Sequence, residues 1–220
     1  MILARLVVLT SLTIALTACA GEVRRDVVVG SPRNVQVAVP AAATLQLTLP
    51  PGDSVIEAGD DSELKADMEI RCASATDACA KRAAEVQWIV ASSDSKLELS
   101  FSPDSMFEFR DSETTTHVWV PADRPVTVSM SAGDLQIRRV SGCLDVDLSA
   151  GDVSIEVPAA SVHTAHLDAN VGDASLATPG NSIEGRRRLL VGAEVNWQEG
   201  EGSCALSVDL GAGDIEAKLY

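Results

Sequence analysis

Four cysteines are the residues whose spacing most directly predicts covalent chemistry. Cys72, Cys79, Cys143 and Cys204 form an even set once Cys19 is set aside. In an oxidising compartment such a set forms disulfides, and four cysteines allow three pairings. The near pair, Cys72 and Cys79, is the first candidate. Its six intervening residues do not match the CxxC knuckle of zinc sites and no histidine lies nearby, so no metal is predicted there.

Acidic residues recur beside glycines in the second half of the chain. Each glycine follows a small apolar residue and precedes an acid, at Gly133 and Asp134, Gly151 and Asp152, Gly172 and Asp173, Gly192 and Glu194, and Gly213 and Asp214. Clustered carboxylates are calcium ligands, but the period of about 20 residues does not match the nonapeptide calcium repeats. We interpret the pairs as structural corners, in which glycine adopts positive φ and the carboxylate accepts backbone N–H groups.

Two further clusters could bind ligands. His163 and His166 have the spacing of paired metal ligands on a helix. They lie in a predicted strand, where residues three apart face opposite sides, so no metal site is predicted. Arg186, Arg187 and Arg188 form the only dense basic run. A solvated turn is the favoured interpretation, with an anionic glycan or a partner's acidic patch as the alternative.

Catalytic motifs are missing from the sequence. It holds no GxSxG elbow, no HExxH and no glycine-rich phosphate loop. Cys143 is a disulfide candidate rather than a nucleophile. We therefore predict no catalytic residue, no cofactor and no enzyme activity. A polysaccharide-acting β-helix enzyme, using carboxylates gathered on one face, is the alternative.

The N-terminus has the pattern of a signal peptide, predicted over residues 1–18. Arg5 supplies a positive charge, and the stretch 6–16 is apolar and uncharged. Eleven residues are too short for a bilayer, which a helix crosses in about 20 residues. The segment is therefore predicted to be a processed signal rather than a permanent anchor.

The run from Leu16 through Thr17 and Ala18 to Cys19 resembles the bacterial lipobox. That resemblance implies that Cys19 is acylated and becomes the first residue of a mature lipoprotein. An ordinary secretory signal cut near Ala18 is the alternative, with Cys19 free or disulfide-bonded. Because Ala20 stands where aspartate commonly retains lipoproteins in the inner membrane, the resemblance implies the outer membrane in a bacterium with two membranes.

The charge of the chain narrows its partners. Acidic residues number 32 against 17 basic residues, and removing the predicted signal removes only one basic residue, Arg5. A surface this acidic repels phosphate backbones, and aromatic residues make up only 3% of the chain. Nucleic-acid binding is therefore excluded, and aromatic platforms for sugars are poorly supplied.

Alternation of apolar and polar residues predicts strands over most of the chain beyond residue 34, as at Leu45, Leu47 and Leu49. One short helix is predicted over about 76–86, where alanines and charged helix formers replace β-branched residues. We predict a lipidated cysteine and tether over 19–34, an N-terminal β region over 35–121, and a β-repeat region over 122–220.

The corners recur at spacings of 18, 21, 20 and 21 residues, and apolar residues keep their positions before and after most of them. Each unit is thus two short strands joined at a glycine–acid corner. Units of this kind bury their apolar faces by stacking, which predicts a repetitive β-solenoid or β-helix-like stack. An antiparallel β-sandwich is the alternative.

The distance between Cys143 and Cys204 tests whether the units form a regular stack. Cys143 and Cys204 occupy similar positions in the second and fifth units, which places them roughly 14 Å apart in a regular stack. A disulfide requires Cα atoms within about 7 Å. If these two residues are bonded, the units do not form a simple linear solenoid.

The glycine–acid corners, with the stretch from Ala78 to Phe101 before them, resemble the adhesin-like β-repeat family of bacterial envelope proteins. The resemblance covers roughly residues 40–220. It implies a repetitive β fold on an envelope protein, without a defined activity. We therefore predict a non-enzymatic envelope lipoprotein that presents a rigid β-repeat surface for binding or adhesion to a protein or glycan. A component of envelope assembly or stress sensing that faces the periplasm is the alternative.

Overall fold

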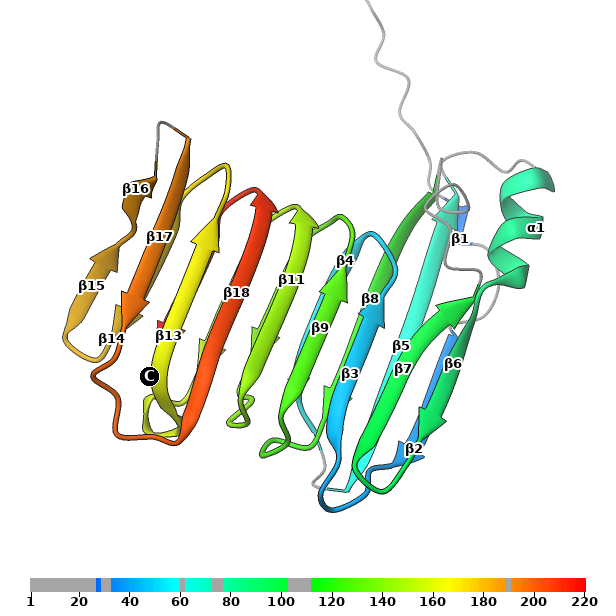
Figure 1. Cartoon of the computed structure of the whole chain (residues 1–220). Helices are drawn as coiled ribbons and strands as arrows, with labels where there is room; N and C mark the ends of the chain where they lie inside the picture. Colours follow the sequence, from blue (N-terminus) through cyan, green and yellow to red (C-terminus); the bar gives the residue numbers. More distant parts are fainter. Residues whose placement is uncertain (1–26, 29–32, 60–61, 73–76, 103–111, 189–190) are drawn as a thin grey trace, which may run out of the picture.

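The computed structural model describes residues 27–28, 33–59, 62–72, 77–102, 112–188 and 191–220. The described part of the chain is all-β with one short α-helix (Figure 1). The predicted signal peptide, Cys19 and most of the predicted tether lie outside the described residues. Within the described ranges, no helix is both long enough and apolar enough to span a bilayer.

The elements before the predicted repeat region are strands and the helix. They are β1 (Val27–Val28), β2 (Arg33–Ala38), β3 (Thr44–Leu49), β4 (Asp53–Ala58), β5 (Glu63–Cys72), α1 (Asp77–Glu85), β6 (Gln87–Ser92), β7 (Lys96–Ser102) and β8 (Ser112–Val120). The helix lies within the predicted range of about 76–86. β1 and the start of β2 pair with β5, so part of the predicted tether belongs to the sheet.

The repeat region is built of strands and one turn of 3₁₀-helix. They are β9 (Val126–Met130), β10 (Leu135–Arg138), β11 (Leu144–Ala150), β12 (Val153–Val157), η2 (Ala159–Ser161), β13 (Val162–Ala169), β14 (Ala174–Thr178), β15 (Asn181–Glu184), β16 (Arg186–Arg188), β17 (Gly192–Trp197), β18 (Cys204–Ala212) and β19 (Ile215–Leu219).

These strands form two large mixed sheets that face each other. Sheet A has the order β1-β5-β8-β4-β10-β12-β19-β14-β15, with β2 also paired to β5, and sheet B has the order β16-β17-β13-β18-β11-β9-β3-β7-β6. The central strands of both sheets pair in parallel, and antiparallel pairs are found toward the ends. The layout is sandwich-like, but its central pairing is parallel rather than antiparallel.

The units do not stack in chain order. β18 lies between β11 and β13, and β19 lies between β12 and β14, so the fifth unit is inserted between the second and third. The predicted chain-order solenoid is therefore not what the topology shows. Because the corners are spaced almost equally along the sequence, any unit has the right length to pair with any other. The spacing therefore does not specify which units are neighbours.

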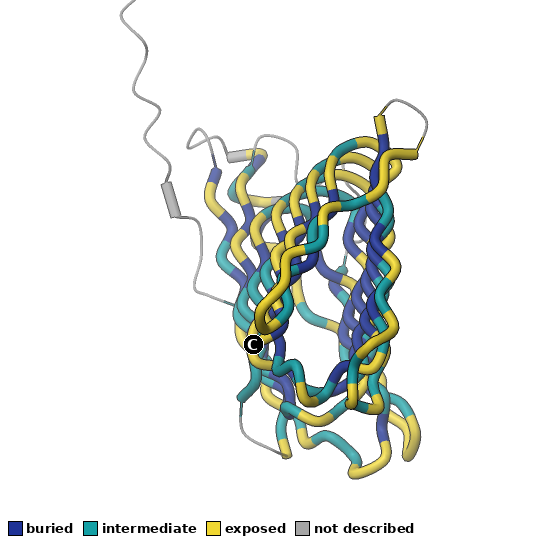
Figure 2. The backbone as a smooth tube through the Cα atoms, turned by 90° about the vertical axis from the view of Figure 1, so that its left-hand side faces the viewer, coloured by how far each residue is buried: buried dark blue, intermediate teal, exposed yellow. Residues whose placement is uncertain are grey.

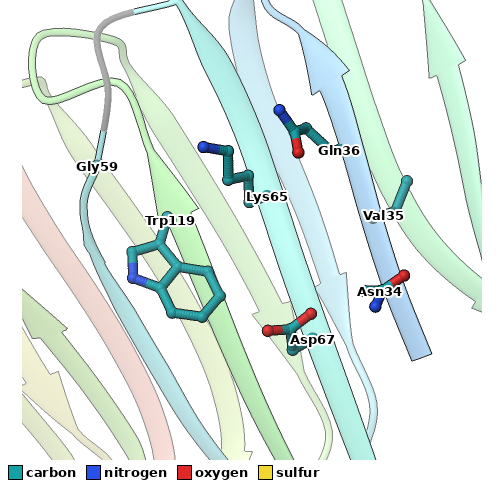
Figure 3. Close-up of a pocket in the computed structure, with 7 residues that line it drawn as sticks. All are labelled: Asn34, Val35, Gln36, Gly59, Lys65, Asp67 and Trp119. Atoms are coloured by element: carbon teal, nitrogen blue, oxygen red, sulfur yellow. The ribbon is translucent and has the colours of Figure 1, made fainter. Parts of the chain in front are cut away.

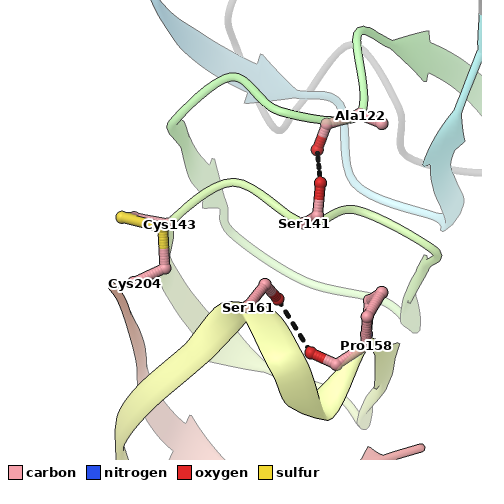
Figure 4. Close-up of a disulfide and its surroundings, with 6 residues drawn as sticks. All are labelled: Ala122, Ser141, Cys143, Pro158, Ser161 and Cys204. Atoms are coloured by element: carbon pink, nitrogen blue, oxygen red, sulfur yellow. Dashed lines mark hydrogen bonds between the residues drawn. A yellow bond between two sulfur atoms is a disulfide. The ribbon is translucent and has the colours of Figure 1, made fainter. Parts of the chain in front are cut away.

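A disulfide joins the inserted unit to its neighbour. Cys143 precedes β11, Cys204 begins β18, and their Cα atoms lie 4.6 Å apart (Figure 4). The predicted separation across three units disappears because the second and fifth units are adjacent. In the chain-entropy description, closing a span of 61 residues contributes about 4 kcal/mol, against about 2 kcal/mol for the span of 7 between Cys72 and Cys79.

The core lies between the sheets and runs from one end of the stack to the other. In the view along the stack, residues coloured as buried recur along the strands of both layers (Figure 2). One continuous cluster includes Leu45 and Leu47 from the predicted N-terminal region together with Val208 and Leu219 from the repeat region. Both predicted regions therefore contribute to the same two sheets and to one core.

Glycine corners connect the two sheets. At the corners of the first, second, third and fifth units φ is positive, between +115° and +134°. Gly133, Gly151 and Gly213 each donate their N–H to the carbonyl of the residue that precedes the next corner glycine in the stack, as Gly151 does to Ala212 at 2.9 Å. A Cβ on Gly151 would lie 2.0 Å from the carbonyl oxygen of Gly133. The corners approach one another so closely that only glycine fits.

Replacing Gly151 by alanine should lower the free energy of unfolding by more than about 3 kcal/mol, because left-handed strain adds to a backbone clash. Gly180→Ala is the matched control, since Gly180 also has positive φ (+93°) but nothing lies within 4 Å of its Cβ position. Its expected cost is about 1 kcal/mol. Chemical denaturation with the disulfides intact measures both variants, and equal losses would contradict a role for the close approach.

Candidate binding site

Glu57 is the centre of a polar cluster on the outward face of sheet A. Its Oε1 accepts the indole N–H of Trp119 at 2.9 Å and lies 3.1 Å from Nε2 of His117. Its Oε2 accepts a hydrogen bond from Arg139 at 2.8 Å. Strand register produces this contact, because Glu57 of β4 lies directly beside Trp119 of β8. The four residues come from three segments that are far apart in the sequence and meet through the parallel pairing of β4 with β8 and β10.

The tryptophan ring of this cluster is held in one orientation. Trp119 and His117 are two residues apart on β8, and their rings stack with centroids 3.9 Å apart and planes inclined by 24°. The base of the Trp119 side chain also lies close to the backbone of Gly59, since a Cβ on Gly59 would lie 2.9 Å from the Cβ of Trp119. The result is a half-buried aromatic platform with little conformational freedom left to lose on binding.

A groove of about 600 Å³ opens beside this platform (Figure 3). Polar side chains from neighbouring strands line it: Lys65 and Asp67 lie on β5, and Asn34 and Gln36 lie on β2. Carboxylate, amide and ammonium groups therefore surround one aromatic face. This combination, an apolar surface with a few placed polar groups, is what small-molecule and sugar sites present.

The electrostatics of the cluster favour an ionised Glu57. Partial burial raises the pKa of Glu57, but hydrogen bonds from Arg139 and Trp119 and the positive charges of His117 and Arg139 more than offset that effect, so the pKa lies below its ordinary value. Arg139 has φ of +60°, which is uncommon for a residue other than glycine. An ionised glutamate in this position holds the aromatic platform and accepts hydrogen bonds.

The predicted corner acids are also brought together, in a second groove of about 440 Å³ on sheet A. Oδ1 of Asp134 accepts the N–H of Asp152 at 3.2 Å, Oδ1 of Asp152 accepts that of Asp214 at 2.9 Å, and Oδ1 of Asp214 accepts that of Asp173 at 2.8 Å. Asp173 then pairs with Arg187 at 2.5 Å. Three of the predicted corner carboxylates, those of Asp134, Asp152 and Asp214, accept backbone N–H groups, and with Asp173 they form a continuous row.

The fourth predicted corner is wrong. Gly192 begins β17, which runs antiparallel to β13, and Glu194 lies within that strand beside Asp168. Gly192 is not among the glycines with positive φ. The physical reason is a reversal of the chain through β15, β16 and β17, which ends the parallel stack at this side. Val191 nevertheless supplies the carbonyl that accepts the N–H of Gly172, at 2.7 Å.

One corner was missed by the sequence analysis. Gly52, with φ of +134°, and Asp53 join β3 to β4, and the Gly52 N–H donates to the carbonyl of Ala132 at 3.0 Å. The signal was present, since Leu45, Leu47 and Leu49 precede Gly52 by seven, five and three residues, as in the other units. Proline in place of a small apolar residue before the glycine obscured it.

The remaining predicted residues are placed as follows. Cys72 and Cys79 form a disulfide, as do Cys143 and Cys204. His163 and His166 do not meet, because His163 contacts the carbonyl of Gly200 and His166 contacts Asn196. The arginine run forms an exposed edge strand rather than a turn, and each arginine pairs with a different acid: Glu194, Asp173 and Asp168 for residues 186, 187 and 188.

Together these features define an all-β protein of two facing mixed sheets, with a rigid polar outward surface that contains an aromatic groove. No family model matches the chain, and no curated protein matches it. Among solved structures, it is similar to that of a candidate cell adhesion protein from Clostridium sporogenes ATCC 15579, with a TM-score of 0.49 and 15% sequence identity, over 86% of this chain and 100% of that chain. A likeness at this level assigns no family and no activity.

Acidification should test the role of Glu57. A carboxyl whose pKa is lowered by folding stabilises the native state above its unfolded pKa, and this stability is lost as pH falls through the folded pKa. Between about pH 5 and pH 3 the wild type should therefore lose more stability than Glu57→Gln. Denaturation midpoints across this range measure the difference. An identical slope in Glu57→Gln and the wild type would contradict the assignment.

Proposed function

We propose that this chain is a non-enzymatic lipoprotein of the bacterial cell envelope that binds a ligand through the outward face of sheet A. The observation that carries the proposal is the fixed Trp119 platform within a polar groove. Of the three tryptophans, Trp88 and Trp197 pack against the core, whereas Trp119 belongs to the outward surface and contacts Glu57. The inward face of sheet A is packed in the core, so its outward face presents the half-exposed indole in a fixed orientation. An indole held in this way is suited to binding a ligand.

A glycan is the ligand class that these groups favour. The C–H face of a sugar ring stacks on an indole, while its hydroxyls exchange hydrogen bonds with carboxylates and amides such as Asp67, Asn34 and Gln36. The low aromatic content of the sequence predicted few aromatic platforms for sugars. One indole that is held in place, that of Trp119, is sufficient for one binding site. A protein ligand remains the second outcome of the binding test, because the same groups also accept peptide side chains.

The envelope location rests on different observations. The signal pattern and the lipobox-like run predict lipid on Cys19, and two disulfides suit an oxidising compartment. Ala20 after the cysteine supports the outer membrane. In this arrangement the lipid holds the chain at the membrane, and the two sheets form the body that meets the ligand, either at the cell surface or in the periplasm.

Trp119→Ala should abolish retention of the purified full chain on its glycan, because the stacking surface is lost. Binding is measured on an array of bacterial envelope polysaccharides and host glycans. Asp67→Asn should weaken the same interaction at least tenfold, which corresponds to one charged hydrogen bond. Asp145→Asn, an exposed carboxylate on the opposite sheet, is the matched control and should bind as the wild type does. Unchanged binding by Trp119→Ala would place the site elsewhere, and binding to proteins alone would favour a peptide ligand.

Cys19→Ser should release the chain from the membrane fraction into the soluble fraction, because the acylated thiol is its anchor. Fractionation followed by immunoblotting measures the distribution. Protease treatment of intact cells then separates the two faces: digestion supports surface display and adhesion, whereas protection until the outer membrane is opened supports the periplasmic assembly or sensing role. Membrane retention of Cys19→Ser would refute the lipid anchor.

A further inference from the structure

We infer that the outward face of sheet B carries a binding site for a divalent transition-metal ion of the zinc type. Its ligands are His166 and Asp168 of β13 and Asp209 of β18. One potential ligand atom from each residue lies within 4.8 Å of the other two. The inference concerns the opposite sheet from the Trp119 groove and does not depend on the proposed function.

Strand geometry places the three side chains together. His166 and Asp168 are two residues apart on one strand and therefore point to the same, outward side. Asp209 lies directly beside Asp168 in the parallel pair of β13 and β18. Because backbone pairing fixes all three positions, the site is largely formed before an ion binds. His166 and Asp168 are half-buried and Asp209 is exposed, which leaves a route for the ion.

The tautomer of His166 is set for metal binding. Asn196 Nδ2 donates to Glu194 Oε1 at 2.7 Å, which fixes the orientation of the Asn196 amide. Its Oδ1, which only accepts, therefore faces Nδ1 of His166 at 2.8 Å. Nδ1 must carry the proton, so the neutral imidazole has its lone pair on Nε2. A hydrogen bond from the far nitrogen to an oxygen is the usual support of a metal-bound histidine.

Asp168 supplies the second indication of a cation. One oxygen, Oδ2, is paired with Arg188. The other, Oδ1, is fully buried and has no hydrogen-bond partner among the described residues. A buried carboxylate oxygen without a partner costs free energy, and an ion is one of the groups that satisfies it. Arg188 can stay in place when the ion binds, because Asp168 would contact Arg188 through Oδ2 and the ion through Oδ1.

The donor set and the surrounding charge select the kind of ion. Asp147 lies beside Asp209, and Glu194 lies beside Asp168, so four acids from adjacent strands form one row. Arg186 and Arg188 compensate only two of these charges. An imidazole nitrogen with two carboxylates is typical of zinc-type ions, whereas Ca²⁺ and Mg²⁺ prefer oxygen ligands alone.

Calorimetric titration of the full chain with ZnCl₂ tests the inference, with protein that carries no histidine tag. One equivalent should bind to the wild type, and His166→Gln should weaken the affinity at least tenfold. Asn196→Ala, which removes only the support of the imidazole, should weaken it by about 10-fold to 100-fold. His163→Gln is the matched control, because this exposed histidine lies on the same strand but contacts Gly200 instead, and it should bind as the wild type does.

Each contrary result overturns the assignment. Equal zinc affinity in His166→Gln and the wild type would show that the imidazole is not a ligand. Loss of binding in His163→Gln would show that the ion binds at a different site. Equally tight binding of CaCl₂ would show that carboxylate oxygens alone are the ligands. Circular dichroism of His166→Gln and Asn196→Ala confirms that a loss of affinity is not a loss of fold.

Discussion

The structure depends on the close approach of successive corners. Where a chain passes from one sheet to the other, the corner glycine donates its N–H to the neighbouring unit, and its Cα nearly touches the neighbouring carbonyl. This contact sets the register of the central strands in both sheets, because each corner joins a strand of sheet B to a strand of sheet A. The aspartate after the glycine repeats the constraint, since its carboxylate accepts the next aspartate's N–H. Like charges are tolerated in this row because three of the carboxylates accept a backbone N–H and the fourth, that of Asp173, is paired with Arg187.

Much of the fold could be predicted from local pattern. The alternation that marks Leu45, Leu47 and Leu49 recurs in the buried residues of nearly every central strand, and the single helix lies where β-branched residues are missing. The order of the units could not be predicted, because periodicity encodes the shape of a unit and not the identity of its neighbour. Cys143 and Cys204 held the missing information, since similar positions in two units can be bonded only if those units are adjacent.

The candidate sites were less predictable for a related reason. Glu57, His117, Trp119 and Arg139 carry no sequence motif, and they meet because β4 lies between β8 and β10. The same holds for His166, Asp168 and Asp209 on the other sheet, where His166 was considered only together with His163. Inward residues are constrained by packing, whereas outward residues are free to vary. The outward face of sheet A carries the Trp119 groove and the row of corner aspartates, and the outward face of sheet B carries His166 within a row of acids.

The inserted fifth unit governs the order in which this protein can assemble. The strands between Cys204 and Leu219, β18 and β19, follow all the other described strands in the sequence, yet they occupy interior positions in the two sheets. Until they arrive, the strands of the second and third units have open edges facing each other, and open edges pair readily with other chains. The nascent protein therefore cannot complete its sheets progressively from the N-terminus. A chain that stopped short of β18 would lose one interior strand from each sheet rather than one end of the stack.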